Sequence, residues 1–269
     1  MNAPAGPERR ARAEPATPPR VNLLGVGVSA ISMDQAVGTI ASWIERREAR
    51  YVCVTPAHSL MDAYRDEAFR RILNHSGMTT PDGMAVVWLL KLYGQRQVTR
   101  VYGPDLLLAV CRRSVESGWR HFFYGGEAGV AERLAATLEQ RFPGLQVAGT
   151  YSPPFGALSP EEDARVVAQL NAARPDVIWV GLSSPKQERW MAEHRERLDA
   201  PVLVGVGAAF DFLSGRKPQA PRWMQRAGLE WLFRFSHEPR RLWPRYRQYP
   251  LFVWLALMQL TGIKKFPID

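Results

Sequence analysis

Short apolar runs rich in β-branched residues recur along the chain, and most are followed by segments in which apolar positions repeat at helical spacing. The apolar runs predict strands at residues 21–28, 51–55, 78–80, 121–124, 147–150, 177–180 and 202–206. The other segments predict helices at residues 33–46, 59–73, 84–92, 104–117, 128–141, 160–172 and 185–197. Ser32 is suited to cap the first helix. This alternation predicts an α/β fold with a mostly parallel sheet flanked by helices.

The residues that follow each predicted strand are the candidates for a binding site, because ligands of such sheets lie beyond the carboxyl ends of the strands. Asp82 comes directly after the third run and before Gly83 and an apolar helix. Its carboxylate is suited either to cap that helix or to act as a general base on a substrate hydroxyl. Spacing alone favours the cap, which is the commoner role.

Three further segments at strand ends carry candidate binding residues. Gly125 and Gly126 open a glycine-rich turn that suits a nucleotide diphosphate or is simply a tight turn. Lys186 and Gln187 follow a proline at a predicted helix start, where they meet an anion or a sugar, or remain solvated surface residues. Asp211, after the last run, is either a site residue or a turn acid.

The C-terminal segment holds most of the chain's positive charge. Residues 216–269 contain eleven lysines and arginines against three acidic residues, which accounts for eight of the nine formal excess charges. Nine aromatic residues lie between positions 223 and 254. A basic, aromatic segment is typical of proteins that contact a membrane, a nucleic acid or a phosphorylated substrate.

An apolar stretch at residues 250–260 helps to decide between a membrane, a nucleic acid and a phosphorylated substrate as the partner of this segment. It is shorter than the ~20 residues that a membrane-spanning helix needs, and basic residues flank it on both sides. This pattern favours an interfacial helix on an anionic membrane over the alternative of a last helix packed on the domain. We therefore expect a flexible leader at residues 1–20, an α/β catalytic domain at 21–215 and a membrane-associating appendage at 216–269.

Several other features narrow the class of protein. The leader lacks the apolar run of a signal peptide, and Cys53 and Cys111 have no paired spacing, so we expect buried free thiols in the cytosol. The histidines lack metal-ligand spacing, and neither a G-x-S-x-G elbow nor a phosphate-binding G-x-x-x-x-G-K-[ST] loop occurs. No metal or cofactor is expected. The alternatives are a basic nucleic-acid-binding α/β protein and, with less support, a nicotinamide oxidoreductase, for which the three-glycine fingerprint is missing.

A set of motifs in a fixed order gives the chain a resemblance to a known family. The segments are Val54-Thr55-Pro56, Pro81-Asp82-Gly83, Gly181-Leu182 with Pro185-Lys186-Gln187-Glu188, residues 205–212, Leu229-Glu230-Trp231-Leu232-Phe233-Arg234, and Glu238-Pro239-Arg240-Arg241-Leu242-Trp243. Together they closely resemble the WecG/TagA/CpsF glycosyltransferase family, over about residues 21–247.

The resemblance implies a Rossmann-like fold and an inverting, metal-independent enzyme at the cytosolic face of the membrane. Such an enzyme moves a sugar from a UDP-sugar donor to a polyprenyl-diphosphate-linked saccharide during cell-surface polysaccharide synthesis. A homo-oligomer is a further expectation, and nucleic acid is not an expected partner.

The resemblance also implies roles for particular residues. Asp82 matches the catalytic base. The residues implied to bind or approach substrate are Thr55, Gln187, Gly125, Gly126, Arg234, Arg240 and Arg241, the arginines belonging to an appendage that closes over the site. Two positions depart from the family pattern, Ala57 in place of asparagine and Gln219 in place of arginine. Loss of the amide at Ala57 changes the hydrogen-bonding groups offered to a sugar, so N-acetylmannosamine, glucose and a uronic acid all remain candidate donors.

Overall fold

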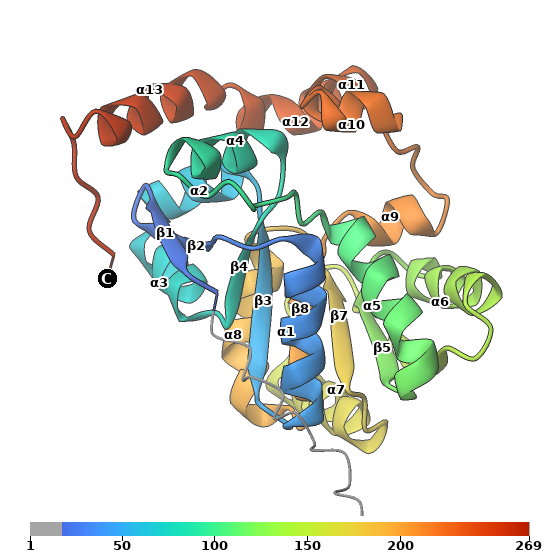
Figure 1. Ribbon diagram of the computed structural model, residues 1–269. Coiled ribbons are helices and arrows are strands. Elements are labelled where there is room, and N and C mark those ends of the chain that lie inside the picture. The colour runs from blue at the N-terminus through green and yellow to red at the C-terminus, as the bar shows by residue number, and fades with distance from the viewer. Residues whose placement is uncertain (1–17, 269) are drawn as a thin grey trace, which may run out of the picture.

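The computed structural model describes residues 18–268 (Figure 1). Along the chain the elements are β1 (Arg20–Leu23), β2 (Val26–Ser29), α1 (Met33–Glu45), β3 (Arg50–Thr55), α2 (Ala57–Arg65), α3 (Glu67–His75), β4 (Met78–Pro81), α4 (Met84–Leu92), α5 (Gly103–Ser117), β5 (Arg120–Gly125), α6 (Val130–Arg141), β6 (Gln146–Tyr151), α7 (Pro160–Ala172), β7 (Val177–Gly181), α8 (Lys186–His194), the 3-10 helix η1 (Arg195–Arg197), β8 (Val202–Gly205), α9 (Ala209–Leu213), α10 (Arg222–Arg226), α11 (Glu230–His237), α12 (Pro239–Tyr246) and α13 (Tyr249–Leu260). Most of the predicted leader lies outside the described residues, and the chain is already in strand β1 at Arg20.

A six-stranded sheet forms the centre of the molecule, with the strand order β4-β3-β8-β7-β5-β6. Every neighbouring pair in it is parallel. Parallel strands need crossover connections, and here helices provide them on both faces of the sheet. Alternate residues of β3 accordingly enter two different cores, Cys53 on one side and Val52 and Val54 on the other. The predicted Rossmann-like α/β fold is confirmed.

The first apolar run, residues 21–28, is not a strand of this sheet. It forms the antiparallel hairpin β1–β2, whose two-residue turn consists of Leu24 and Gly25. Both turn residues have positive φ, 54° and 88°, as in a type I′ hairpin turn. The hairpin lies beside the edge of the sheet, where the Thr79 amide donates to Ser29 Oγ. The prediction of one continuous strand was wrong because the turn lies within the apolar run.

The predicted helix at residues 59–73 is divided into α2 and α3. Asp66 ends the first helix in an extended conformation, and its side chain caps the second by accepting from the Phe69 amide at 2.9 Å. The Ser32 cap of α1 and the exact bounds of α4 and α7 are as predicted. Cys53 and Cys111 are free and buried, as expected.

Helices α10 to α13 run across the carboxyl ends of the strands (Figure 1). Helix α13 packs Phe252, Leu255 and Ala256 against the domain, while Trp254 and Leu257 are exposed on its outer side. The end of the chain returns to the β1–β2 hairpin. There Gln259 accepts from the Leu24 amide and donates to Asn22 O, each at 2.9 Å.

We call residues 216–268 the appendage. None of the helices within residues 18–268 has the length and apolar character needed to cross a membrane.

Candidate active site

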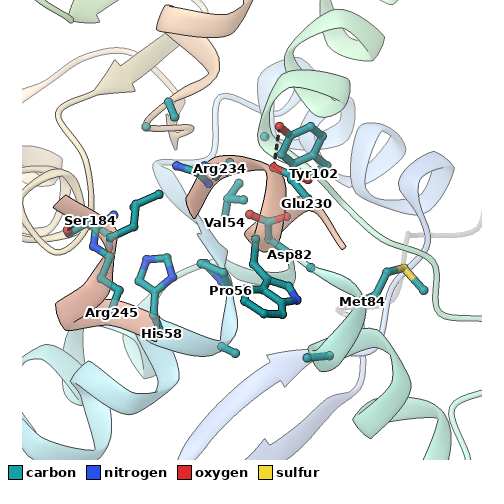
Figure 2. A pocket seen from close by; sticks show the side chains of 18 of the residues that line it. Val54, Pro56, His58, Asp82, Met84, Tyr102, Ser184, Glu230, Arg234 and Arg245 are labelled. Atoms are coloured by element: carbon teal, nitrogen blue, oxygen red, sulfur yellow. Dashed lines mark hydrogen bonds between the residues drawn. The ribbon is translucent and has the colours of Figure 1, made fainter. Parts of the chain in front are cut away.

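A cavity lies between the carboxyl ends of the strands and the appendage (Figure 2). Residues that follow β3, β4, β7 and β8 line it on the side of the sheet, and residues of α11, α12 and α13 line it on the side of the appendage. Predicted residues that line it are Asp82, Gln187, Arg234 and Arg241. The structure thus brings together four side chains from three distant parts of the sequence.

Asp82 is held at the end of β4 by its backbone, because its amide donates to Thr55 O at 3.2 Å. Its carboxylate points into the cavity (Figure 2) and accepts from the Arg100 guanidinium at 3.3 Å. The following helix α4 is capped by Gly83, which has a positive φ of 82° and provides no side-chain cap. The interpretation of Asp82 as a helix cap is therefore wrong, and the carboxylate is available to a ligand.

Burial is the largest influence on the Asp82 carboxyl and raises its pKa above the ordinary value, because a low-dielectric surrounding disfavours the charged form. The adjacent Arg100 guanidinium acts in the opposite direction, and the nearby Glu230 carboxylate adds to the increase. A carboxylate with a raised pKa is a stronger base than an ordinary aspartate, as general-base catalysis requires.

Arg100 connects this carboxylate to the appendage, and sequence reasoning missed it. Its guanidinium lies between Asp82 and Glu230 of α11, with 2.6 Å from Nη2 to Glu230 Oε2. The other oxygen of Glu230 accepts from the Tyr102 hydroxyl at 3.1 Å (Figure 2). Arg100 precedes α5 in an irregular segment without a motif, so nothing in the sequence distinguishes it from the chain's other arginines.

The appendage brings further cations to the cavity. Arg234 lies over the ring of Phe212 at 5.6 Å, and Arg245 donates to Ser184 O at 3.2 Å. Arg241 also lines the cavity, whereas Arg240 is exposed and does not. His58, which sequence reasoning also missed, has its pKa lowered to about 3 by burial and by Arg245 and Arg234. The histidine is thus neutral, so the positive charge of the cavity comes from the arginines.

Gln187 reaches the cavity from the first turn of α8 and is buried. A Cβ placed on Gly205 would come within 3.1 Å of Gln187 Nε2, and one on Gly207 within 3.4 Å of Gln187 Oε1. Gly205, the last residue of β8, therefore makes room for this amide, and Gly207 lies beside its oxygen. Lys186, next to it in sequence, is exposed and does not line the cavity.

The other predicted site residues have protein partners and lie outside the cavity lining. The Thr55 hydroxyl donates to Cys53 O at 3.1 Å, and Asp211 pairs with Arg216 and Lys217 at the start of the appendage. The Gly126 amide donates to Gly181 O at 3.0 Å. A Cβ on Gly125 would come within 2.7 Å of the Gly181 backbone, so that glycine permits close packing of β5 against β7. Substrate contacts by these residues stay predictions.

A largely buried carboxylate near several arginines, at the strand ends of a parallel α/β sheet, is the arrangement of an enzyme site suited to an anionic substrate. The profile of the glycosyl transferase WecG/TagA/CpsF family matches residues 21–265, and the chain belongs to this family.

Three relatives carry the name N-acetylglucosaminyldiphosphoundecaprenol N-acetyl-beta-D-mannosaminyltransferase. The protein of Bacillus spizizenii is 29% identical over 217 residues, 80% of this chain and 82% of the relative. That of Bacillus subtilis is 28% identical over 235 residues, 87% and 85% of the two chains. That of Staphylococcus aureus is 25% identical over 248 residues, 91% and 95%. The family match therefore includes both the parallel sheet with its helices and the appendage.

Proposed function

We propose that this protein is an inverting glycosyltransferase that moves a sugar from a UDP-sugar to a polyprenyl-diphosphate-linked saccharide in cell-surface polysaccharide synthesis. The observation that carries the proposal is the Asp82 carboxylate, which is 18% exposed at a strand end and shares one cavity with appendage arginines. The names of the three relatives support the choice of acceptor.

In the proposed reaction Asp82 accepts the proton of the acceptor hydroxyl. The acceptor oxygen then forms a bond to the anomeric carbon of the donor sugar. The bond between that carbon and the UDP oxygen breaks, and its electron pair leaves with the diphosphate. Attack from the face opposite the leaving group inverts the configuration at the anomeric carbon.

The leaving diphosphate gains negative charge during this step and needs positive partners. Arg234 and Arg241 line the cavity and are suited to that role, since guanidinium groups bind phosphate oxygens in a bidentate manner. Within residues 18–268 no group of three or more His, Cys, Asp or Glu side chains is arranged to hold a metal ion. Metal independence stays a prediction, which an assay without divalent ions tests.

The donor sugar is proposed from the relatives as N-acetylmannosamine, with glucose or a uronic acid as alternatives. Ala57 lines the cavity, so its departure from the family pattern lies within the proposed substrate site. An amide there would offer one donor and one acceptor group that alanine lacks.

The decisive experiment measures transfer to polyprenyl-diphosphate-N-acetylglucosamine in detergent with a panel of UDP-sugars, in parallel with and without divalent metal. Turnover with one donor identifies both the reaction and the sugar. Absence of turnover with every donor, for folded protein, would contradict the proposal for this acceptor. A longer lipid-linked saccharide is then the next acceptor to assay.

We further propose that the protein associates with the cytosolic face of the membrane through helix α13. A helix that is apolar all round is normally buried, yet Trp254 and Leu257, which do not line the cavity, are 61% and 52% exposed on its outer side. The basic residues of the preceding helix and of positions 264 and 265 are suited to anionic lipid headgroups.

Replacing Trp254 and Leu257 together by glutamate is expected to weaken binding to anionic vesicles by about tenfold or more, because apolar area no longer enters the lipid. Cosedimentation with phosphatidylglycerol vesicles measures the effect. Val115→Glu, at an exposed apolar position near the end of α5, is the matched control and is expected to leave binding unchanged. Equal loss in both proteins would contradict a specific role for α13. Binding to oligonucleotides but not to vesicles would instead favour a nucleic-acid-binding protein.

A further inference from the structure

The side-chain amide of Gln187 is held in one place by its surroundings. Its nitrogen lies on the side of Gly205, and its oxygen lies on the side of Gly207, which lines the cavity. The oxygen is buried and has no hydrogen-bond partner within the described part of the chain. A buried acceptor without a partner is costly, so a ligand group that donates a hydrogen bond beside Gly207 would be favoured there.

The next residue, Glu188, determines which way the amide faces. Its side chain is 1% exposed, and its Oε1 accepts from Gln187 Nε2 at 3.0 Å. An ionised carboxylate only accepts hydrogen bonds. The nitrogen of the amide must therefore face Glu188, and the oxygen must face away from it.

From this geometry, and resting on the function proposed above, we propose that Glu188 is a positioning residue for substrate binding. Its ionised carboxylate holds Gln187 with Oε1 towards Gly207, as a hydrogen-bond acceptor for a hydroxyl or amide N–H of the sugar nucleotide. Gln187 contacts the ligand, and Glu188 acts through it. A protonated Glu188 would donate to Gln187 Oε1 instead, so the amide would turn over and present its NH2 group to the ligand.

The surroundings of Glu188 bring this change into the neutral pH range. Burial raises the pKa of Glu188 to about 7, and the Asp62 carboxylate of α2 adds to the increase. The hydrogen bond from Gln187 and the nearby Ser184 side chain act in the opposite direction. The Cys53 thiol of β3 also faces this carboxyl, while β7 and β8 contribute no ionisable side chain. Two other elements pack against α8 and carry charged groups near it. In η1, the Arg195 guanidinium is bound to backbone carbonyls. Before α3, Asp66 pairs with Arg189 on the surface.

The sign of the expected pH effect follows from that pKa. Above about pH 7 Glu188 is ionised and the amide presents its oxygen, whereas below it the carboxyl is protonated and the amide is reversed. The KM for the sugar nucleotide should therefore rise as the pH is lowered from 8 to 6.

A kinetic double-mutant cycle tests the functional part of the proposal. Glu188→Gln removes the charge at constant shape and is expected to raise the KM for the UDP-sugar about tenfold at pH 8, with loss of the inflection near neutral pH. Glu193→Gln, at an exposed position on the same helix, is the control and should retain the wild-type profile. In a Gln187→Ala background the Glu188→Gln change should have no further effect. Additive effects of the two substitutions would overturn the proposal.

A spectroscopic measurement tests the positioning without any assay of activity. The side-chain amide resonances of Gln187, identified by their loss in Gln187→Ala, are followed by ¹⁵N NMR between pH 6 and pH 8.5. They are expected to titrate with a midpoint near 7 in the wild type and in Glu193→Gln, and not in Glu188→Gln. No titration in the wild type, or an unchanged one in Glu188→Gln, would refute the coupling. If no UDP-sugar is transferred by the wild type, the proposed function fails and the NMR result still decides on the coupling.

Discussion

Replacing Asp82 by asparagine is expected to lower the rate of sugar transfer by about a hundred- to ten-thousandfold. The amide has nearly the shape of the carboxylate but cannot accept the proton of the acceptor hydroxyl. Because no side chain caps α4 and the Asp82 backbone is held by Thr55 O, the fold should remain intact. Single-turnover transfer to the lipid-linked acceptor measures the rate, and calorimetry with the UDP-sugar should show binding close to that of the wild type.

The control for this variant is Asp199→Asn, at an exposed position before β8 and thus at the opposite end of the sheet from the cavity. It should transfer sugar at the wild-type rate. The wild-type rate itself should fall as the pH drops through the pKa of Asp82, which burial holds above its ordinary value, since the protonated group is no longer a base. Near-normal transfer by Asp82→Asn would mean that another group takes the proton.

The three appendage arginines that the sequence predicts as substrate ligands should differ strongly in effect. Arg234→Ala is expected to lower kcat by about a hundred- to a thousandfold, the usual cost of removing a group that stabilises developing charge. Arg241, which lines the cavity but is exposed and pairs with Glu238, should matter less. Arg240, outside the cavity lining, should matter least of the three. Steady-state kinetics in detergent, where membrane attraction is absent, gives the ranking.

Arg226→Ala provides the matched control, because Arg226 is an exposed appendage arginine on α10 that does not line the cavity. It should retain wild-type kcat. If all four variants lose the same activity, the arginines act through the net charge of the appendage, and the assignment of Arg234 to the leaving diphosphate is wrong.

The sequence predicted the sheet well because strands buried on both faces are continuous apolar runs bounded by turns. The runs that became β3, β5, β7 and β8 are of this kind. The first run failed as a prediction because apolar content does not reveal a reversal of direction. The turn there needs positive φ at both Leu24 and Gly25. A glycine in the sequence indicates that conformation only at position 25, and a leucine gives no such indication at position 24.

For the site, the sequence located Asp82 and Gln187 because each follows a strand, and strand ends converge in a parallel sheet. It missed Arg100, His58 and Arg245, which reach the cavity from an irregular segment, from the first turn of α2 and from the appendage. Their convergence is a product of tertiary packing and has no periodic signature. Lys186 and Arg240 are the opposite case, because the sequence predicted them as site residues and the structure does not place them in the cavity lining. Each is next to a lining residue in the sequence.

Arg100 contacts both Asp82 and Glu230 of the appendage, so the pKa of Asp82 depends on the position of the appendage. Glu230 raises the pKa of Asp82 and competes for the Arg100 guanidinium. If the appendage lifted, Asp82 would lose this negative neighbour, gain solvent and keep Arg100 to itself, and each of these changes lowers its pKa. Loss of the Arg234 charge acts in the opposite direction, but Arg234 is a smaller influence than burial or Glu230. A donor sugar bound in an uncovered cavity would then face a weaker base, so wasteful transfer to water would be suppressed until the cover is in place.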